Sequence, residues 1–183
     1  MSLLPDTYYI EKIQAGETEC FSVLLERYSQ PVFSLVVKIA GNREDAEELT
    51  QDVFLKVFRG FSSFQGNSLF STWLYGIAYN VAISATRKKR YEWLPIEESM
   101  IEKAPESETS DEMGQLAREE QLNRLEKAMT QLLPDERALI TLFYMQEKSI
   151  EEIVAITRLS TSNVKTKLHR IRKKMFVLMK AME

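Results

Sequence analysis

The stretch that decides the fold of the last quarter of the chain begins with Ser149-Ile150-Glu151-Glu152 and continues as Thr157-Arg158-Leu159-Ser160-Thr161-Ser162-Asn163-Val164-Lys165-Thr166-Lys167-Leu168-His169-Arg170-Ile171-Arg172-Lys173-Lys174. Its first four residues have the form of a capping box, in which a serine and a glutamate three positions later cap a helix start. A short turn then leads to a helix with basic residues on one side and apolar residues on the other. This pattern predicts a helix-turn-helix whose second helix suits the DNA major groove.

The last helix has a narrow apolar sector when it is placed on a wheel of 100° per residue, and we expect this sector to pack on the preceding helices. Cations on the other side are suited to phosphate, and polar groups there can reach base edges. The alternative is a solvated basic helix that its own dipole stabilises. The apolar sector holds Val164, Leu168, Ile171 and Met175, and the opposite side holds Ser162, Thr166, His169, Arg170 and Lys173.

The composition is that of an ordinary soluble protein, with 44% hydrophobic and 28% charged residues and a net charge of −3. Cys20 is the only cysteine and His169 the only histidine, so we expect no disulfide, no metal site and no cofactor. No apolar run approaches the roughly 18 residues of a membrane span, and no signal peptide is evident. We therefore expect a cytoplasmic protein that does not insert into a membrane.

The charge is unevenly distributed along the chain. Residues 158–180 hold eight basic and no acidic residues, whereas residues 92–120 hold ten acidic and two basic residues. Because salt screens charge over about 10 Å, a mildly acidic chain can still carry a DNA-facing surface.

The helical periodicity predicts an all-α protein with two small helical domains joined by an acidic, flexible linker. We expect helices over 7–15, 18–40, 43–59 and 71–87 in the first domain. Few apolar residues and most of the acidic excess mark the linker. The predicted boundaries are 1–91 for the N-terminal domain, 92–115 for the linker and 116–183 for the C-terminal helix-turn-helix domain.

Two faces of the N-terminal domain have the composition of binding surfaces, one for single-stranded DNA and one for a protein. Tyr75 and Tyr79 lie one turn apart on a helix that runs into the basic block 87–90, and exposed aromatics beside cations suit single-stranded DNA. Contact of these tyrosines with another part of the protein is an equally good interpretation. On the preceding helix, Gln51, Asp52 and Lys56 lie away from the apolar stripe and form a possible docking face for a protein.

Several separated motifs, in this order, resemble conserved regions of bacterial sigma factors. Residues 45–54 (Asp-Ala-Glu-Glu-Leu-Thr-Gln-Asp-Val-Phe) and 70–75 (Phe-Ser-Thr-Trp-Leu-Tyr), with Ile77-Ala78 and Asn80, are similar to the second region. Residues 133–137 (Leu-Pro-Asp-Glu-Arg), 149–153 (Ser-Ile-Glu-Glu-Ile) and 164–170 (Val-Lys-Thr-Lys-Leu-His-Arg) are similar to the fourth. The short chain without a folded middle domain resembles the extracytoplasmic-function (ECF) group.

The resemblance implies a factor that binds core RNA polymerase, recognises the minus-35 and minus-10 promoter elements and promotes promoter melting. It implies contacts with the clamp helices of the largest polymerase subunit and with the flap, and an anti-sigma factor as a further partner. We expect minus-35 contacts from Thr161, Ser162, Asn163, Lys165, Thr166, His169, Arg170 and Lys173. We expect minus-10 contacts from Phe64, Phe70, Ser71, Trp73, Tyr75, Tyr79, Asn80, Arg87 and Lys88. The expected polymerase contacts are Glu48, Gln51, Asp52 and Lys56.

The sequence departs from the family pattern at a few positions. Gly76 stands where arginine is common and Ser84 where aspartate is common, Ser162-Asn163 replaces a frequent Gly-Thr, and the turn lacks glycine. Three rival functions remain in view. A plain helix-turn-helix regulator would bind palindromic duplex DNA as a dimer without polymerase, an enzyme would need a catalytic set that the sequence does not display, and an adaptor would leave the basic helix unexplained.

Overall fold

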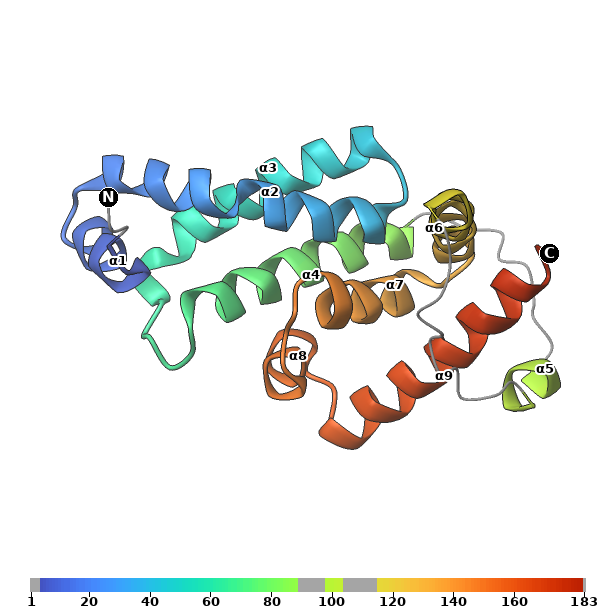
Figure 1. Cartoon of the computed structure of the whole chain (residues 1–183). Coiled ribbons are helices and arrows are strands. Elements are labelled where there is room, and N and C mark those ends of the chain that lie inside the picture. The colour runs from blue at the N-terminus through green and yellow to red at the C-terminus, as the bar shows by residue number, and fades with distance from the viewer. Residues whose placement is uncertain (1–3, 89–97, 104–114, 183) are drawn as a thin grey trace.

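The computed structural model describes residues 4–88, 98–103 and 115–182, and in these ranges every regular element is a helix. The all-α prediction is therefore confirmed. The first half of the chain forms a bundle of long helices, and α1 packs against its end beside the loop that leads into α4 (Figure 1). Its elements are α1 (Asp6–Gln14), the 3₁₀ turn η1 (Thr18–Cys20), α2 (Phe21–Ala40), α3 (Arg43–Gly60), the 3₁₀ turn η2 (Phe61–Ser63) and α4 (Phe70–Lys88).

The sharp corner between α2 and α3 follows from its local sequence. Gly41 ends α2 in the left-handed conformation, with φ of 82°, which costs glycine little. The side chain of Asn42 then accepts a hydrogen bond of 2.9 Å from the backbone N–H of Asp45 and caps α3. This tight reversal lays α3 back along α2, so that Leu35 and Val53 are both fully buried in the core.

The second half of the chain consists of shorter helices. The helix α5 lies within the range expected to be linker, while the rest of that range, 92–97 and 104–114, lies outside the described residues. The apolar stripe predicted for the last helix is confirmed, because all four of its residues are buried. The elements are α5 (Glu98–Glu102), α6 (Gln115–Thr130), α7 (Pro134–Ile140), the π-helical turn η3 (Thr141–Met145), α8 (Ile150–Thr157) and α9 (Thr161–Lys180).

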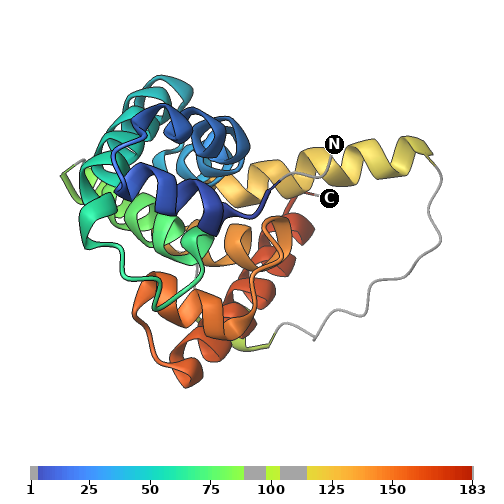
Figure 2. The ribbon, with the colours of Figure 1, turned by 90° about the vertical axis from the view of Figure 1, so that its left-hand side faces the viewer.

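The two halves pack directly against each other: α8 lies on α4, and α7 contacts both α2 and α4 (Figures 1 and 2). Arg137 of α7 is 5% exposed. Its guanidinium donates a hydrogen bond of 2.9 Å to the carbonyl oxygen of Ile39 at the end of α2, and one of 3.3 Å to Thr130 in its own half. A buried guanidinium needs such acceptors, because an unpaired buried charge is costly. Arg137 therefore ties the two helical domains together.

Candidate nucleic-acid interface

The helix-turn-helix is built as its sequence predicts. The side chain of Ser149 accepts a hydrogen bond from the N–H of Glu152 (3.1 Å), whose carboxylate accepts one from the N–H of Ser149 (2.9 Å). These two bonds complete the capping box that starts α8. Ser160 caps α9 by accepting a hydrogen bond of 3.2 Å from the N–H of Asn163. The residue that ends α8 adopts the left-handed conformation, which often requires glycine. Here Arg158 adopts it, with φ of 60°.

The polar side of α9 is accessible at its N-terminal half. Six of the eight residues expected to contact the minus-35 element are exposed, while His169 and Lys173 are partly buried. The ammonium of Lys173 donates a hydrogen bond of 3.3 Å to the carbonyl oxygen of Glu102 in α5. The exposed six are Thr161, Ser162, Asn163, Lys165, Thr166 and Arg170.

Two cations on one flank of α9 form ion pairs with carboxylates of α7. The ammonium of Lys167 lies 2.9 Å from a carboxylate oxygen of Asp135. The ammonium of Lys174 lies 2.7 Å from a carboxylate oxygen of Glu136. These pairs add to the apolar packing that holds α9 on its own domain, and they partly neutralise the charge of the two lysines.

The end of α3, the turn η2 and the start of α4 enclose a cluster of aromatic rings. Phe61 and Phe70 are buried and stack on each other with a centroid distance of 5.7 Å. Phe64 and Trp73 are only partly buried, and their ring centroids lie 4.9 Å apart. A β-carbon on Gly60 would lie 3.2 Å from the Trp73 ring, so glycine there makes room for the tryptophan. Phe64 and Trp73 thus present ring surface from a rigid base.

Tyr75 does not form the exposed aromatic face that the sequence suggested, and that expectation of exposure is wrong. The Tyr75 side chain is 3% exposed, because the helix-turn-helix domain covers it. Its hydroxyl donates a hydrogen bond of 2.6 Å to the side-chain oxygen of Gln146, and the ammonium of Lys148 lies 5.1 Å from its ring centroid. Burial raises the pKa of Tyr75 to about 12. The structure supports the alternative interpretation for Tyr75, namely that it contacts another part of the protein.

Tyr79, one turn further along α4, is also partly covered. Its pKa is raised by burial and by the nearby carboxylate of Asp135 in α7. The rest of the expected minus-10 set is distributed around this face: Ser71 is partly buried, Asn80 and Arg87 are exposed, and the side chain of Lys88 lies outside the described residues.

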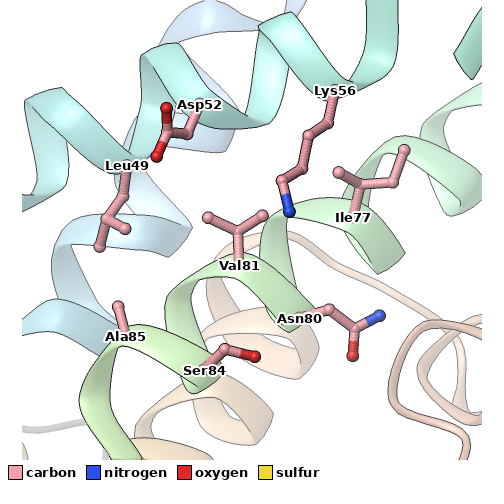
Figure 3. A pocket seen from close by; sticks show the side chains of 8 residues that line it. All are labelled: Leu49, Asp52, Lys56, Ile77, Asn80, Val81, Ser84 and Ala85. Atoms are coloured by element: carbon pink, nitrogen blue, oxygen red, sulfur yellow. The ribbon is translucent and has the colours of Figure 1, made fainter. Parts of the chain in front are cut away.

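A pocket of about 440 Å³ opens between α3 and α4. Figure 3 shows Lys56 reaching from α3 toward α4, where Ile77 and Val81 form the apolar floor. Asn80 lies at the rim, and its amide nitrogen donates a hydrogen bond of 2.8 Å to the carbonyl oxygen of Gly76. The pocket therefore joins Asn80, expected to contact DNA, with Asp52 and Lys56, expected to contact polymerase.

All four residues of the expected polymerase set, on α3, are exposed. Sequence analysis missed Leu55 on the same helix, whose side chain is 51% exposed. Its position off the apolar stripe was the available signal. A large apolar side chain among Gln51, Asp52 and Lys56 is typical of a protein-binding surface.

Among the described residues, no group of three or more His, Cys, Asp or Glu side chains is arranged to hold a metal ion. Within the same ranges, no helix is long and apolar enough to cross a bilayer. The surfaces that stand out are therefore those of α9, of the aromatic cluster and of the α3–α4 pocket.

Two ranges of the chain match families of known proteins. Residues 24–91 match the Sigma-70 region 2 family and residues 122–175 match Sigma-70, region 4. The chain is 30% identical over 175 residues to the ECF RNA polymerase sigma-E factor of Escherichia coli (strain K12), which covers 92% of this chain and 91% of that protein. The chain belongs to the ECF sigma factors.

Further similarities extend over nearly the whole sigma factor. It is 29% identical over 167 residues to the ECF RNA polymerase sigma factor SigW of Bacillus subtilis (strain 168), which covers 88% of this chain and 89% of the relative. The solved structure of CnrH in complex with the cytosolic domain of CnrY shares its fold, with a TM-score of 0.71, 21% identity and coverage of 97% of this chain and 99% of CnrH. This sigma factor recognises promoters and directs RNA polymerase to initiate transcription there.

Proposed function

We propose that this sigma factor divides promoter recognition between two surfaces. The polar side of α9 contacts the duplex minus-35 element, and the aromatic cluster with the α3–α4 pocket contacts unpaired bases of the minus-10 element. One observation carries this division: the exposed side of α9 is polar, whereas the N-terminal surface combines partly exposed rings with a pocket.

The chemistry of α9 supports duplex binding. Its exposed N-terminal residues, Thr161, Ser162 and Asn163, combine hydrogen-bonding side chains with the backbone N–H groups of a helix start, which favour phosphate. Lys165 and Arg170 are exposed on the turns that follow, and cations there bind the DNA backbone or base edges. His169 and Lys173 extend the same side of the helix.

The N-terminal surface supports single-strand binding. Phe64 and Trp73 offer ring faces on which bases stack, and such stacking contributes about 1–3 kcal/mol per base. The α3–α4 pocket has an apolar floor and a polar rim, which suit the faces and edges of a base rotated out of the stack. Asn80 and Lys56 supply polar and charged groups that line it, and Arg87 is exposed further along α4.

The exposed side of α3 is the proposed docking surface for the clamp helices of the largest polymerase subunit. Glu48, Gln51 and Asp52 supply polar contacts, and Leu55 supplies apolar area on the turn that follows them. The helix-turn-helix domain would contact the flap. We place the protein in the cytoplasm, where polymerase and promoters are found.

We also propose that the domains separate when polymerase binds, because Tyr75 is inaccessible to DNA while Gln146 covers it. An anti-sigma factor is the proposed partner of the inactive state. Two structures with the same fold support this, CnrH with the cytosolic domain of CnrY and RpoE with the anti-sigma factor NepR from Bartonella quintana.

Reconstitution with core RNA polymerase on a promoter library tests the assignment, and transcription from a defined subset of promoters is the expected result. Failure to initiate with any cognate core enzyme would contradict it. A photo-crosslinking residue at Leu55 should capture the largest subunit, whereas the same residue at Leu122, exposed on α6, should not.

A further inference from the structure

The loop that carries Phe64 is held by a helix that lies outside the region 2 match. That match begins at residue 24, whereas α1 ends at Gln14. The side-chain nitrogen of Gln14 donates a hydrogen bond of 2.9 Å to the carbonyl oxygen of Phe61 and another of 2.9 Å to that of Phe64. One side chain thus binds both ends of the turn η2.

The helix α1 is itself fixed in place, so it can act as an anchor. The carboxylate of Asp6 accepts hydrogen bonds from the guanidinium of Arg27 and from the hydroxyl of Tyr28, both on α2. Ile10 and Ile13 are buried against the bundle. Gln14 therefore projects from a helix that is attached to the domain along its length.

The carbonyl groups that Gln14 binds belong to the residues that orient the aromatic cluster. Phe61 is buried against Phe70, while the ring of Phe64 lies over Trp73. Beyond Phe64 the chain is irregular until α4 begins at Phe70. Within the part of the chain that the structure describes, Gln14 is the residue that donates a hydrogen bond to the Phe64 carbonyl oxygen.

We propose that Gln14 is a positioning residue that holds Phe64 and its loop in the geometry that receives unpaired promoter bases. This rests on the proposed single-strand role of the N-terminal surface. The amide suits the task because it supplies two donors on one nitrogen without a charge. Glutamate has the same shape but only accepts, so it would face two carbonyl oxygens without a proton to share.

The test compares Gln14→Glu, Gln14→Lys and Glu11→Ala in the holoenzyme with core polymerase. Glu11 is exposed on the same helix and serves as the matched control. Lysine restores a donor and is the rescue variant. The probe is a fork-junction DNA with an unpaired minus-10 strand, selected from a random library by the parent holoenzyme. The same DNA with both strands paired is the comparison.

We expect Gln14→Glu to bind the unpaired probe about tenfold more weakly, since two hydrogen bonds are lost. Binding to core enzyme and to the paired probe should not change, Gln14→Lys should recover part of the affinity, and Glu11→Ala should match the parent. Unchanged affinity in Gln14→Glu would overturn the proposal. A parallel loss of core binding and thermal stability would overturn it too, because Gln14 would then be a purely structural residue.

A measurement without DNA separates this proposal from the proposed function. Trp73 reports on the Phe64 ring that lies over it, and the second tryptophan, Trp93, is replaced by phenylalanine in every variant. We expect Gln14→Glu to shift Trp73 emission and to increase its quenching by iodide. If the parent bound paired and unpaired probes alike, the single-strand role would fail. If Trp73 emission and quenching were unchanged in Gln14→Glu, Gln14 would not position the loop that carries Phe64.

Discussion

The two surfaces proposed to bind DNA differ in how the free chain presents them. The N-terminal half of α9 is exposed and fixed by ion pairs within its own domain, so it needs no rearrangement to meet a duplex. The face of α4 that carries Tyr75 is covered by the other domain. Under the proposed division of labour, duplex contact is compatible with the closed chain and full contact with unpaired bases is not.

Under the proposed function, promoter melting would therefore depend on the opening of the protein. The apolar packing of α7 and α8 on α2 and α4 closes it, together with three particular contacts: the Arg137 guanidinium on Ile39, the Tyr75 hydroxyl on Gln146, and the close approach of α8 to Gly76. Each can be changed separately, and so can each DNA surface.

The largest expected effect comes from Leu168→Asp. This variant tests whether the two domains that carry these surfaces fold independently. Leu168 is 3% exposed within the core of the helix-turn-helix domain. Losing its side chain and burying a carboxylate costs about 4 kcal/mol or more. We expect minus-35 binding and part of the helical circular dichroism to be lost, while binding to the unpaired probe remains. Leu122→Asp, the same substitution at a residue of α6 that is 53% exposed, is the control, and a global loss of structure in Leu168→Asp would refute independent folding.

Gly76→Arg should separate the domains, because it introduces the side chain common in the family where α8 packs on α4. A β-carbon on Gly76 would lie 3.8 Å from the carbonyl oxygen of Ile156, which is ordinary contact. Gly76→Ala should therefore stay closed, whereas the longer side chain must displace α8 at a cost of about 1–3 kcal/mol. Fluorescence energy transfer between dyes on the two domains measures the change. If energy transfer in Gly76→Arg equalled that in the parent protein, the contact between α8 and Gly76 would not control opening.

Removing two cations from α9, in the double variant Arg170→Ala and Lys173→Ala, should weaken minus-35 binding without affecting the unpaired probe. Each cation at a phosphate or base contributes about 1 kcal/mol, so a loss of roughly thirtyfold is expected. Fluorescence anisotropy with the holoenzyme and duplex DNA gives the affinity. Unchanged promoter use would mean that a different side of α9 faces DNA.

Asn80→Ala should slow open-complex formation about tenfold, consistent with the loss of one or two polar contacts to an unpaired base. Core binding should stay intact, because Asn80 lies at the pocket rim on α4 and not on the proposed docking side of α3. Permanganate footprinting follows the melted bases. If core binding fell instead, Asn80 would belong to the polymerase surface.

The smallest effect concerns pH. The pKa of Tyr75 is raised to about 12 in the closed chain, from 10.0 when the phenol is exposed. The closed form therefore binds the proton more tightly, and its advantage starts to fall as the pH approaches 10 and is lost as the pH rises on toward 12. Between pH 9 and 10 the loss is roughly 0.4 kcal/mol. Energy transfer between the domains should decrease slightly over this range, and Tyr75→Phe should remove the trend.

Much of the helix-turn-helix could be predicted from sequence because its signals are local. The capping box at Ser149 and the buried stripe from Val164 to Met175 follow from spacings of three and four residues. The left-handed turn was not visible as a glycine, because Arg158 occupies it.

The relations between distant segments could not be predicted in this way. The burial of Tyr75 depends on Gln146, 71 positions later, and the hold on Phe64 depends on Gln14, 50 positions earlier. Periodicity describes which side of a helix is apolar, but it does not identify the surface that covers that side. The same limit explains why Lys56 was grouped with the polymerase contacts although it also lines the pocket beside Asn80.

The ion pairs of Lys167 with Asp135 and of Lys174 with Glu136 have a consequence for the ionic atmosphere around the promoter complex. DNA binding is driven in part by the counterions that cationic side chains release from phosphates. A lysine already neutralised by a carboxylate adds little to that release. Of the eight basic residues between 158 and 180, these two should therefore hardly contribute, and affinity for promoter DNA should resist rising salt better than the charge of the helix suggests.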